Sequence, residues 1–165
     1  MNIQAAIAQV VAGQSLSRAD METVMRTVMQ GEATEAQIGG LLVGLRMKGE
    51  TIDEIVGAAS VMRSLATPVD IDTDGLIDLA GTGGDGANLF NVSTAATFVV
   101  AGAGGRIAKH GNRSVSSSSG SSDVLSALGV DLSVSPAAIA DSIASIGVGF
   151  MFAPMHHSAM KHAIG

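Results

Sequence analysis

Two segments of the sequence combine glycine, hydroxyl and amide side chains in an order that suits phosphate binding. The first, the glycine segment, spans residues 81–94, opens with GTGGDG and places Asn91, Ser93 and Thr94 at the expected start of a helix. Glycines let backbone N–H groups approach an anion closely, and a helix start adds a favourable dipole. A turn followed by an ordinary helix cap would explain either part alone. Both parts together, beside a second segment of related composition, favour a phosphate site.

The second segment, the serine segment, is KHGNRSVSSSSGSSDVL at 109–125. Its composition resembles that of a flexible linker, which would have no regular structure on either side. Here a strand is expected before it, and a helix capped by Ser121 or Ser122 is expected after it. Lys109 and Arg113 would balance the charge of a bound anion. We therefore interpret the serine segment as a site.

Two familiar nucleotide motifs do not fit the glycine segment. GTGGDG matches G-x-G-x-x-G, but that motif requires an acidic residue about 20 positions later to hold the ribose. After Asp85 the next acidic residue is Asp123. A Walker loop ends in Gly-Lys-Ser or Gly-Lys-Thr, and no lysine occurs between Lys48 and Lys109. Dinucleotide and Walker-type sites are therefore excluded.

Composition and charge narrow the class of protein. The chain has 165 residues, a formal net charge of −6 and no cysteine, and 47% of its residues are hydrophobic. Nucleic acid and anionic membranes are poor partners for an acidic surface. No apolar run is long enough to span a membrane, and the first residues lack the basic region of a signal peptide. We expect a globular cytoplasmic protein.

The first part of the chain predicts a small helical domain over residues 1–67. A first helix is expected over about 2–12, and three capping-box spacings start further helices, namely Ser17 to Asp20, Thr34 to Gln37 and Thr51 to Glu54. Four short helices cannot bury all of their apolar stripes. We therefore expect a partner surface, which is either a homodimer through the helical domain or the rest of the protein.

The remainder alternates strands and helices, which predicts the first part of a parallel-sheet α/β domain. Residues 68–75 read as a hinge and 76–165 as the start of that domain. The expected strands are 76–80, 106–110, 130–134 and 148–152, and the expected helices are 92–104, 121–129, a helix capped by Ser135, and a final helix over 155–165 able to pack back on the helical domain. Ligands bind beyond the carboxyl ends of parallel strands, where both segments would lie.

The two segments together are specific enough to indicate a family. GTGGDG followed by FNVST at 81–94, with KHGNRSVSS, SG and DVL at 109–125, resembles anthranilate phosphoribosyltransferase. The resemblance covers the N-terminal half of that family and implies a nucleoside phosphorylase/phosphoribosyltransferase-like fold. It also implies transfer of the phosphoribosyl group of phosphoribosyl pyrophosphate to anthranilate in tryptophan biosynthesis, with Mg²⁺ as cofactor. The products would be N-(5-phosphoribosyl)anthranilate and pyrophosphate.

The resemblance also implies roles for individual residues. Ser93 matches a magnesium ligand, and the positions that match the anthranilate channel are Gly81, His110, Asn112 and His157. The positions that match the phosphoribosyl pyrophosphate site are Gly81, Gly84, Asp85, Asn91, Val92, Ser93, Thr94, Lys109, His110, Gly111, Asn112, Arg113, Ser114, Val115, Ser116, Ser117 and Ser121. No single residue is assigned as the catalytic group.

The sequence departs from the family at several points. Leu89 stands where many relatives have Ser or Thr, and Ser118 replaces a common lysine. The family's anthranilate-binding arginine and its acidic pair for a second magnesium would fall beyond Gly165. We therefore expect the 165-residue chain by itself to bind phosphoribosyl pyrophosphate weakly and to show little or no turnover.

Other functions remain open at this point. A transferase or nucleoside phosphorylase of the same fold would use a different acceptor, and a non-catalytic relative would bind nucleic acid, against which the net charge argues. His156, His157 and His162 suggest a metal site at first sight. However, positions 157 and 162 would lie about 140° apart around a helix, which is a poor geometry for a chelate.

Overall fold

The computed structural model describes residues 1–81, 90–114 and 119–163. The chain divides into two compact units. Residues 1–66 together with 157–165 form the first, here called the helical unit, and residues 67–156 form the second, the sheet unit. Within the described residues, no helix is both long and apolar enough to cross a membrane.

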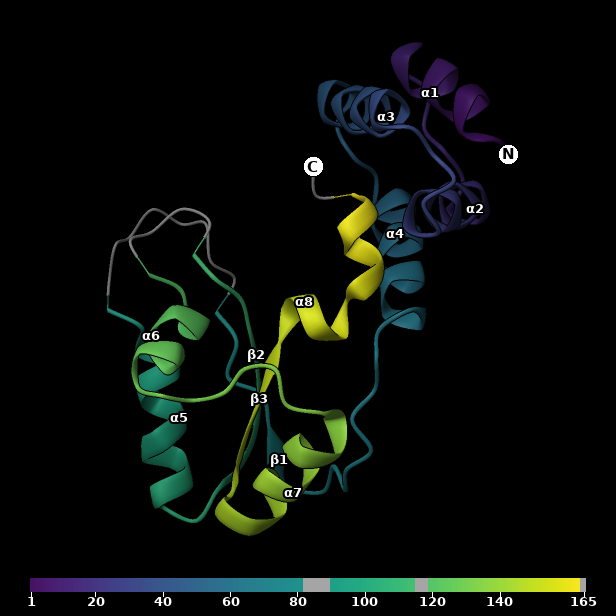
Figure 1. Ribbon diagram of the computed structural model, residues 1–165. Coiled ribbons are helices and arrows are strands. Elements are labelled where there is room, and N and C mark those ends of the chain that lie inside the picture. Colours follow the sequence, from purple (N-terminus) through teal and green to yellow (C-terminus); the bar gives the residue numbers. More distant parts are fainter. Residues whose placement is uncertain (82–89, 115–118, 164–165) are drawn as a thin grey trace. The chain divides into compact units, whose positions relative to one another are not determined.

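The helical unit is built from four helices whose start signals are local. These helices are α1 (Ile3–Val11), α2 (Arg18–Met29), α3 (Glu35–Lys48) and α4 (Ile52–Ser64) (Figure 1). Ser17 accepts a hydrogen bond from the N–H of Asp20, and complete capping boxes are present at Thr34 and Thr51. The predicted starts of α2, α3 and α4 are therefore confirmed. The core they bury includes Ala6, Val10, Val24, Leu41 and Val61.

Two glycines permit close contacts between helices of this unit. α1 packs against α3, and a Cβ atom at Gly44 would lie 2.8 Å from Cγ2 of Val10. α2 packs against α4, where a Cβ at Gly57 would lie 2.8 Å from the carbonyl oxygen of Arg18. Both distances are shorter than van der Waals contact. A larger residue at either position would push the helices apart.

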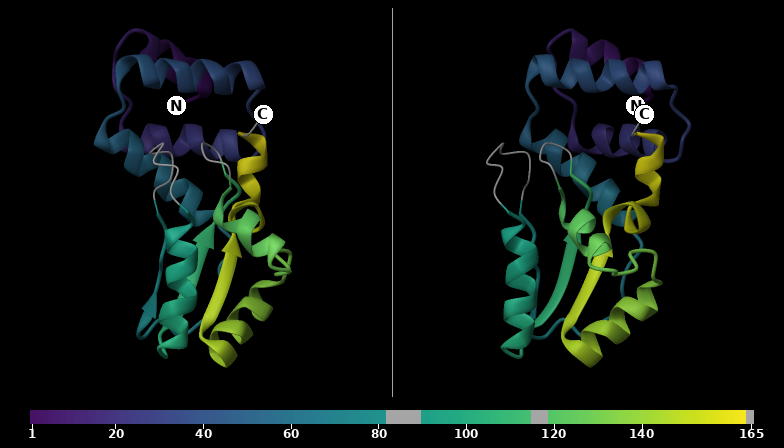
Figure 2. Two further views of the ribbon diagram at one scale, coloured as in Figure 1. Left: turned by 90° about the vertical axis from the view of Figure 1, so that its left-hand side faces the viewer. Right: turned by 60° about the vertical axis from the view of Figure 1, so that its left-hand side comes forward.

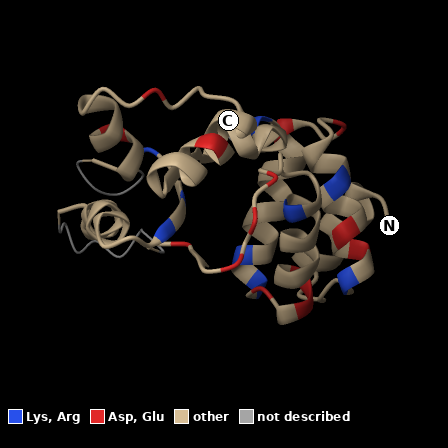
Figure 3. Cartoon of the chain, turned by 90° about the horizontal axis from the view of Figure 1, so that it is seen from below, with Lys and Arg blue, Asp and Glu red and all other residues tan. Residues whose placement is uncertain are grey.

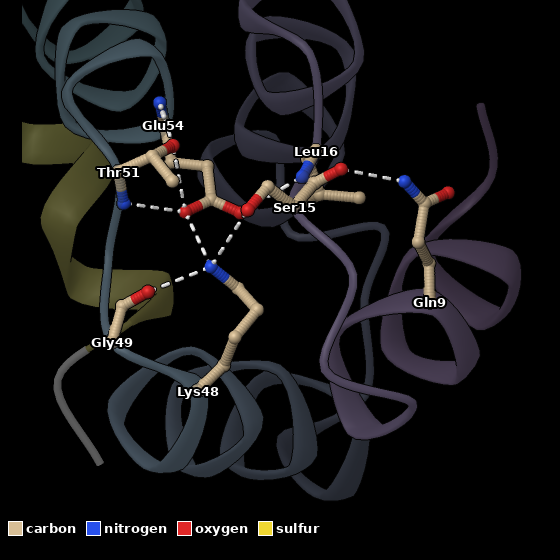
Figure 4. A network of polar contacts seen from close by, with 7 residues as sticks. All are labelled: Gln9, Ser15, Leu16, Lys48, Gly49, Thr51 and Glu54. Carbon is tan, nitrogen blue, oxygen red and sulfur yellow. Dashed lines mark hydrogen bonds and ion pairs between the residues drawn. The ribbon is translucent and has the colours of Figure 1, made fainter.

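A buried carboxylate ties the α1–α2 connection to the α3–α4 connection of the helical unit (Figure 4). One oxygen of Glu54 accepts a hydrogen bond from the N–H of Leu16 at 2.9 Å, and the other accepts from the N–H of Thr51 at 2.7 Å and from Nζ of Lys48 at 2.9 Å. Burial alone would raise the pKa of Glu54, but these hydrogen bonds outweigh it, so the pKa lies below its ordinary value. The carboxylate therefore stays ionised in the folded unit.

The sheet unit contains a parallel three-stranded sheet in the order β1-β2-β3. The strands are β1 (Leu76–Ile77), β2 (Arg106–Gly111) and β3 (Val148–Phe152), and the helices between them are α5 (Val92–Gly102), α6 (Ser121–Ala127) and α7 (Pro136–Ile146). Figure 1 shows α5 and α6 on one face of the sheet and α7 on the other, and the strands run side by side in Figure 2. The predicted fold class, a helical domain followed by a parallel α/β domain, is confirmed.

Successive side chains of β2 point to opposite faces of the sheet and so meet different helices. Ala108 packs against Ile139 and Ile143 of α7. Lys109, the next residue, points to the opposite face, where its ammonium reaches the start of α5. Gly149 on β3 keeps α7 close, because a Cβ there would lie 2.6 Å from Ile143.

Three predicted details of the sheet unit are wrong. The strand expected over 76–80 is limited to β1, and it is not buried, because Ile77 on this outer strand is 41% exposed. The segment 130–134 forms a local turn instead of a strand, since Asp131 accepts hydrogen bonds from both the N–H and the hydroxyl of Ser133. The residue that caps α6 is Gly120 and not one of the serines after it.

The expected helix over 155–165 is interrupted. Its residues form α8 (Ala153–His156) and a 3₁₀ helix, η1 (Ser158–His162). The carbonyl oxygen of His156 accepts a hydrogen bond from the N–H of Thr67 at 2.7 Å, so this carbonyl does not carry the helix onward. Met160 then donates to the carbonyl of His157, which is the tighter 3₁₀ pattern. In the helical unit, η1 packs against α2.

Residues 68–75, read as a hinge from the sequence, belong to the sheet unit. Val69 and Ile71 pack against the cluster formed by Ala108, Ile139 and Ile143. Arg106 donates hydrogen bonds to the backbone carbonyls of Asp72 and Asp74 at 3.0 and 2.9 Å. This connection is thus held on the sheet by apolar packing and by a side chain at the start of β2.

Candidate functional site

The candidate site lies where β1 and β2 end. The glycine segment follows β1 and leads into α5, and the serine segment begins on β2 and leads into α6. Because both strands run in the same direction, these segments leave the same edge of the sheet. Some predicted residues lie outside the described residues, namely Gly84, Asp85, Val115, Ser116 and Ser117, together with the family departures Leu89 and Ser118.

Lys109 joins the two segments. Its ammonium donates hydrogen bonds to Oγ of Ser93 at 3.0 Å and to the carbonyl oxygen of Leu79 at 2.5 Å, and the residue is only 2% exposed. Burial lowers the pKa of Lys109 below its ordinary value, while the charge of Asp78 acts in the opposite direction. A positively charged group is thus held at the start of α5 by uncharged oxygen atoms.

Asn91 makes a second connection between the segments. It occupies the N-cap position of α5, but its side chain does not cap the helix. Instead its Nδ2 donates to Oγ of Ser119 at 3.1 Å, across 28 positions of sequence. The hydroxyl of Thr94, nearby in the first turn of α5, is buried without a hydrogen-bond partner within the described part of the chain. The α5 start therefore offers polar groups beyond those needed for its own cap.

Two glycines of the serine segment are required by space. A Cβ at Gly111 would collide with Oγ of Ser121 and lie 2.9 Å from the ring of Phe150. A Cβ at Gly120 would lie 2.5 Å from both the carbonyl oxygen of Asn112 and the nitrogen of Ser114. The backbone before and after residues 115–118 therefore approaches itself closely.

Asp123 is a residue of the serine segment to which the sequence alone gives no role. Its Oδ2 accepts hydrogen bonds from the N–H of Gly120 at 2.7 Å and from the N–H of Ser114 at 3.0 Å. These bonds hold the pKa of Asp123 below its ordinary value. The one sequence signal was its position, because Asp123 is the acidic residue that ends an otherwise acid-free run after Asp85.

The residues predicted for the anthranilate channel fall in both units. Gly81, His110 and Asn112 belong to the sheet unit, with His110 opposite Met151 in the β2–β3 register. Asn112 is exposed, and its Oδ1 accepts from the N–H of Arg113 at 2.8 Å. His157 belongs to the helical unit, where it precedes η1.

A cavity of about 330 Å³ also opens between α5 and the sheet. Its lining is mainly apolar and includes Phe98, Leu125, Val148 and Phe150, with Lys109 at its wall. An apolar lining does not suit a phosphate group. The described side chains able to meet an anion are instead at the strand ends, where basic, amide and hydroxyl groups converge.

The charge distribution is consistent with this location. The basic residues of the sheet unit are Arg106, Lys109 and Arg113, of which the last two are in the serine segment. In Figure 3 the lysine and arginine residues lie mainly on the helical unit, which holds six of the nine, whereas acidic residues lie on both units. The described side chains thus offer cation, hydroxyl and amide groups at one edge of the sheet, which suits the binding of a phosphorylated ligand.

Comparison with protein families finds two adjacent matches. Residues 4–66 match the helical bundle domain of a glycosyl transferase family, and residues 73–165 match the a/b domain of a glycosyl transferase family. Together they cover nearly the whole chain.

Two curated relatives at high identity carry the same name. Anthranilate phosphoribosyltransferase of Teredinibacter turnerae is 68% identical and that of Cellvibrio japonicus 67% identical, each over all 165 residues. These matches cover 100% of this chain and 48% of each relative. The chain therefore spans about half the length of the curated relatives it matches.

Solved structures agree. Anthranilate phosphoribosyltransferase from Thermus thermophilus is 43% identical with a TM-score of 0.86, covering 96% of this chain and 48% of that one. The Saccharomyces cerevisiae enzyme in complex with PRPP and Mg is 27% identical with a TM-score of 0.85, covering 97% and 48%. A variant of the yeast enzyme in complex with 4-fluoroanthranilate is 27% identical with a TM-score of 0.76, covering 97% and 47%.

Proposed function

The chain belongs to the glycosyl transferase family that joins a helical bundle domain to an a/b domain, and we propose that the whole protein is an anthranilate phosphoribosyltransferase. It would transfer the phosphoribosyl group of phosphoribosyl pyrophosphate to anthranilate and release pyrophosphate, a step of tryptophan biosynthesis. The observation that carries the proposal is the meeting of the two segments through Lys109 with Ser93 and Asn91 with Ser119. These contacts gather polar groups from both segments at one edge of the sheet.

Phosphoribosyl pyrophosphate would bind at this edge. Lys109 supplies the positive charge, and Asn91, Ser93 and Thr94 supply polar groups at the start of α5. The other residues assigned to this substrate are Gly81, Gly84, Asp85, Val92, His110, Gly111, Asn112, Arg113, Ser114, Val115, Ser116, Ser117 and Ser121. Support comes from the yeast relative, which was solved with PRPP and Mg.

Mg²⁺ would take Ser93 as one of its ligands. The hydroxyl oxygen of Ser93 accepts a hydrogen bond from Lys109 and is a hard oxygen ligand of the kind that Mg²⁺ prefers. Within the described residues no three His, Cys, Asp or Glu side chains are grouped to hold a metal. Mg²⁺ commonly takes few protein ligands and is bound also by substrate phosphates and water. When bound, it would neutralise negative charge on the pyrophosphate.

The chemistry requires charge stabilisation more than a strong base. Loss of pyrophosphate from C1 of the ribose leaves positive character on the sugar and negative charge on the leaving group. Lys109 and nearby backbone N–H groups would stabilise that negative charge. The arylamine of anthranilate is neutral near pH 7, so positioning of the two substrates would contribute much of the rate.

The residues assigned to anthranilate are Gly81, His110, Asn112 and His157. The yeast variant in complex with 4-fluoroanthranilate supports a substrate of this class. A transferase of the same fold with another acceptor is the alternative, and it differs only in the acceptor that is consumed.

The protein would act in the cytoplasm as a homodimer formed through the helical unit. Apolar side chains of α3 and α4 are exposed to solvent, including Leu42, Val43, Met47, Ile52 and Ile55. Such a group of exposed apolar residues suits a protein interface. Sedimentation of the whole protein as a monomer at micromolar concentration would count against the homodimer.

The activity is tested with the whole protein. With Mg²⁺ and phosphoribosyl pyrophosphate present, the fluorescence of anthranilate should fall as the product forms. Fluorescence that stays constant at saturating substrates would overturn the proposed activity. A screen of other nitrogenous acceptors, read by pyrophosphate release, would then identify a different acceptor.

A further inference from the structure

We propose that Asp123 is a positioning residue of the phosphate site, which shapes the serine segment without contacting the substrate. Its carboxylate joins Ser114 and Gly120, the described residues on either side of positions 115–118. This inference rests on the proposed function, because the serine segment is assigned there to phosphoribosyl pyrophosphate. Asp123 itself is not among the residues assigned to that substrate.

The backbone at Ser114 and Gly120 has little conformational freedom. One oxygen of Asp123 accepts both backbone N–H groups, at 2.7 Å from Gly120 and 3.0 Å from Ser114. Charge-assisted hydrogen bonds of this kind are short and strong compared with neutral ones. They bring residues six positions apart to a single acceptor atom.

Other contacts also hold the backbone near Ser114 and Gly120. The N–H of Ser122 donates to the carbonyl of Asn112 at 3.3 Å. Gly120 lies so near Asn112 and Ser114 that no side chain would fit there. The backbone on both sides of the segment is therefore held against the start of α6, with Asp123 as the central acceptor.

The segment held by Asp123 is also bonded to the rest of the site through Ser119. This residue precedes Gly120 and accepts the hydrogen bond from Asn91 at the start of α5. Ser93, which lies two positions after Asn91, accepts a hydrogen bond from Lys109. A change in the path of the chain at Gly120 would therefore reach groups of both segments.

The negative charge of Asp123 distinguishes a positioning role from direct contact with the substrate. A carboxylate beside a substrate phosphate would repel it, so removal of the negative charge would strengthen substrate binding. A carboxylate that acts through the backbone has the opposite effect, because removing it loosens the groups that bind phosphate. Asp123→Asn keeps one acceptor oxygen without the charge and so distinguishes the two.

The experiment uses the whole protein with Asp123→Ala and Asp123→Asn. We expect Asp123→Ala to raise the KM for phosphoribosyl pyrophosphate by about tenfold or more, since small displacements of binding groups are costly. Asp123→Asn should raise it by a smaller factor, and the KM for anthranilate should change less than about twofold in both variants. A KM for phosphoribosyl pyrophosphate that is unchanged or lowered in both variants would overturn the proposal.

Asp131→Asn is the matched control. Asp131 also accepts hydrogen bonds within a turn of the sheet unit, from the N–H and hydroxyl of Ser133, but in the connection between α6 and α7. It should leave both KM values unchanged. Melting temperatures show whether each variant is folded. If Asp123→Ala does not fold, Asp123→Asn alone tests the proposal.

Calorimetric binding of phosphoribosyl pyrophosphate keeps the two proposals separate. Wild-type protein that binds this ligand without consuming anthranilate would overturn the activity alone, and the Asp123 variants would then be compared by affinity. Weaker binding by the variants would support the role of Asp123. Equal affinity would reject it, and absence of binding by the wild type would reject both proposals.

Discussion

At the scale of single residues, Lys109 is the group whose placement most needs a functional reason. Its ammonium is buried and bonded to a serine hydroxyl and a backbone carbonyl. Burying a charge costs stability unless it is well compensated, and such groups often occur at functional sites. The lowered pKa of Lys109 reflects this burial. The arrangement is understandable if a substrate anion completes the charge balance.

Lys109→Met should separate binding from stability. We expect the KM for phosphoribosyl pyrophosphate to rise about 100-fold, because a charged donor to the substrate is lost. The melting temperature should fall only slightly, since removal of the ammonium also removes its desolvation cost. Steady-state kinetics and thermal unfolding of the whole protein measure the two effects. Lys161→Met, at an exposed position of η1, is the control and should change neither.

The pH dependence of Lys109 follows from the direction of its pKa shift. A lysine whose folded-state pKa is below the ordinary value of 10.5 binds fewer protons when folded than when unfolded. Its contribution to the free energy of unfolding therefore grows as pH rises from the folded-state pKa towards 10.5. Relative to Lys109→Met, the wild type should gain stability across that window.

At the scale of elements, Glu54 joins the connection between α1 and α2 to the end of α3 and the start of α4. Lys48 and Glu54 are both buried and lie 2.9 Å apart. Breaking a buried ion pair from one side leaves the other charge uncompensated. The network is therefore a sensitive point of the helical unit.

Glu54→Gln should reduce the free energy of unfolding at pH 7 by about 3 kcal/mol. The folded-state pKa of Glu54 is below the ordinary 4.5, so its stabilisation is complete above that value and is lost as pH falls through the folded-state pKa. The difference between wild type and variant should thus shrink in acid. Denaturant titrations at neutral and acidic pH test this, with the exposed Glu50→Gln as control. A difference that does not change with pH would contradict the assignment.

Two glycines of α3 should respond oppositely to the same substitution. Gly39→Ala meets no atom within 4 Å and should stabilise the unit by about 1 kcal/mol, because alanine favours the helix. Gly44→Ala would place a methyl group 2.8 Å from Val10 and should cost about 1–3 kcal/mol. Denaturant unfolding of both variants gives the comparison. A similar gain from both would show that α1 and α3 do not pack as closely as described.

At the scale of the whole molecule, the chain spans about half the length of its curated relatives. Large apolar side chains of the sheet unit are exposed, among them Phe90, Phe98, Val99, Leu128 and Ile146. Exposed apolar groups of this extent are unusual on an isolated domain. Full activity is therefore expected of a protein with the length of the relatives.

The 165 residues alone should bind phosphoribosyl pyrophosphate weakly and show little or no turnover. The reason is that the chain spans only about half the length of its curated relatives, so any substrate contacts made by the other half are missing from it. Calorimetry and anthranilate fluorescence, run in parallel on this chain and on a protein of the relatives' length, test the expectation. Comparable turnover by the two would contradict it.

Several features could be predicted because their causes are local in sequence. The starts of α2, α3 and α4 follow from caps that contact a residue three positions away. The fold class follows from the change between helical periodicity and alternating strands and helices. The family follows from two segments whose residue order is specific.

Other features were missed because they depend on partners far along the chain. The helix expected over 155–165 breaks at His156, which pairs with Thr67. The alternative that Asn91 merely caps α5 is wrong, because its side chain donates a hydrogen bond to Ser119, 28 positions away. The strand expected over 130–134 was missed for a different, local reason: Asp131 accepts the backbone N–H of Ser133, only two positions away.

The amino-acid sequence by itself determined the helix caps, the parallel α/β class and the two segments that indicate a phosphate ligand, because these are set by neighbours along the chain. The tertiary structure alone decided that Lys109 reaches Ser93, that Asn91 reaches Ser119 and that Asp123 gathers Ser114 and Gly120. The reason is physical: a buried donor takes whichever acceptor the packing of strands and helices brings near it, and sequence order does not specify that neighbour.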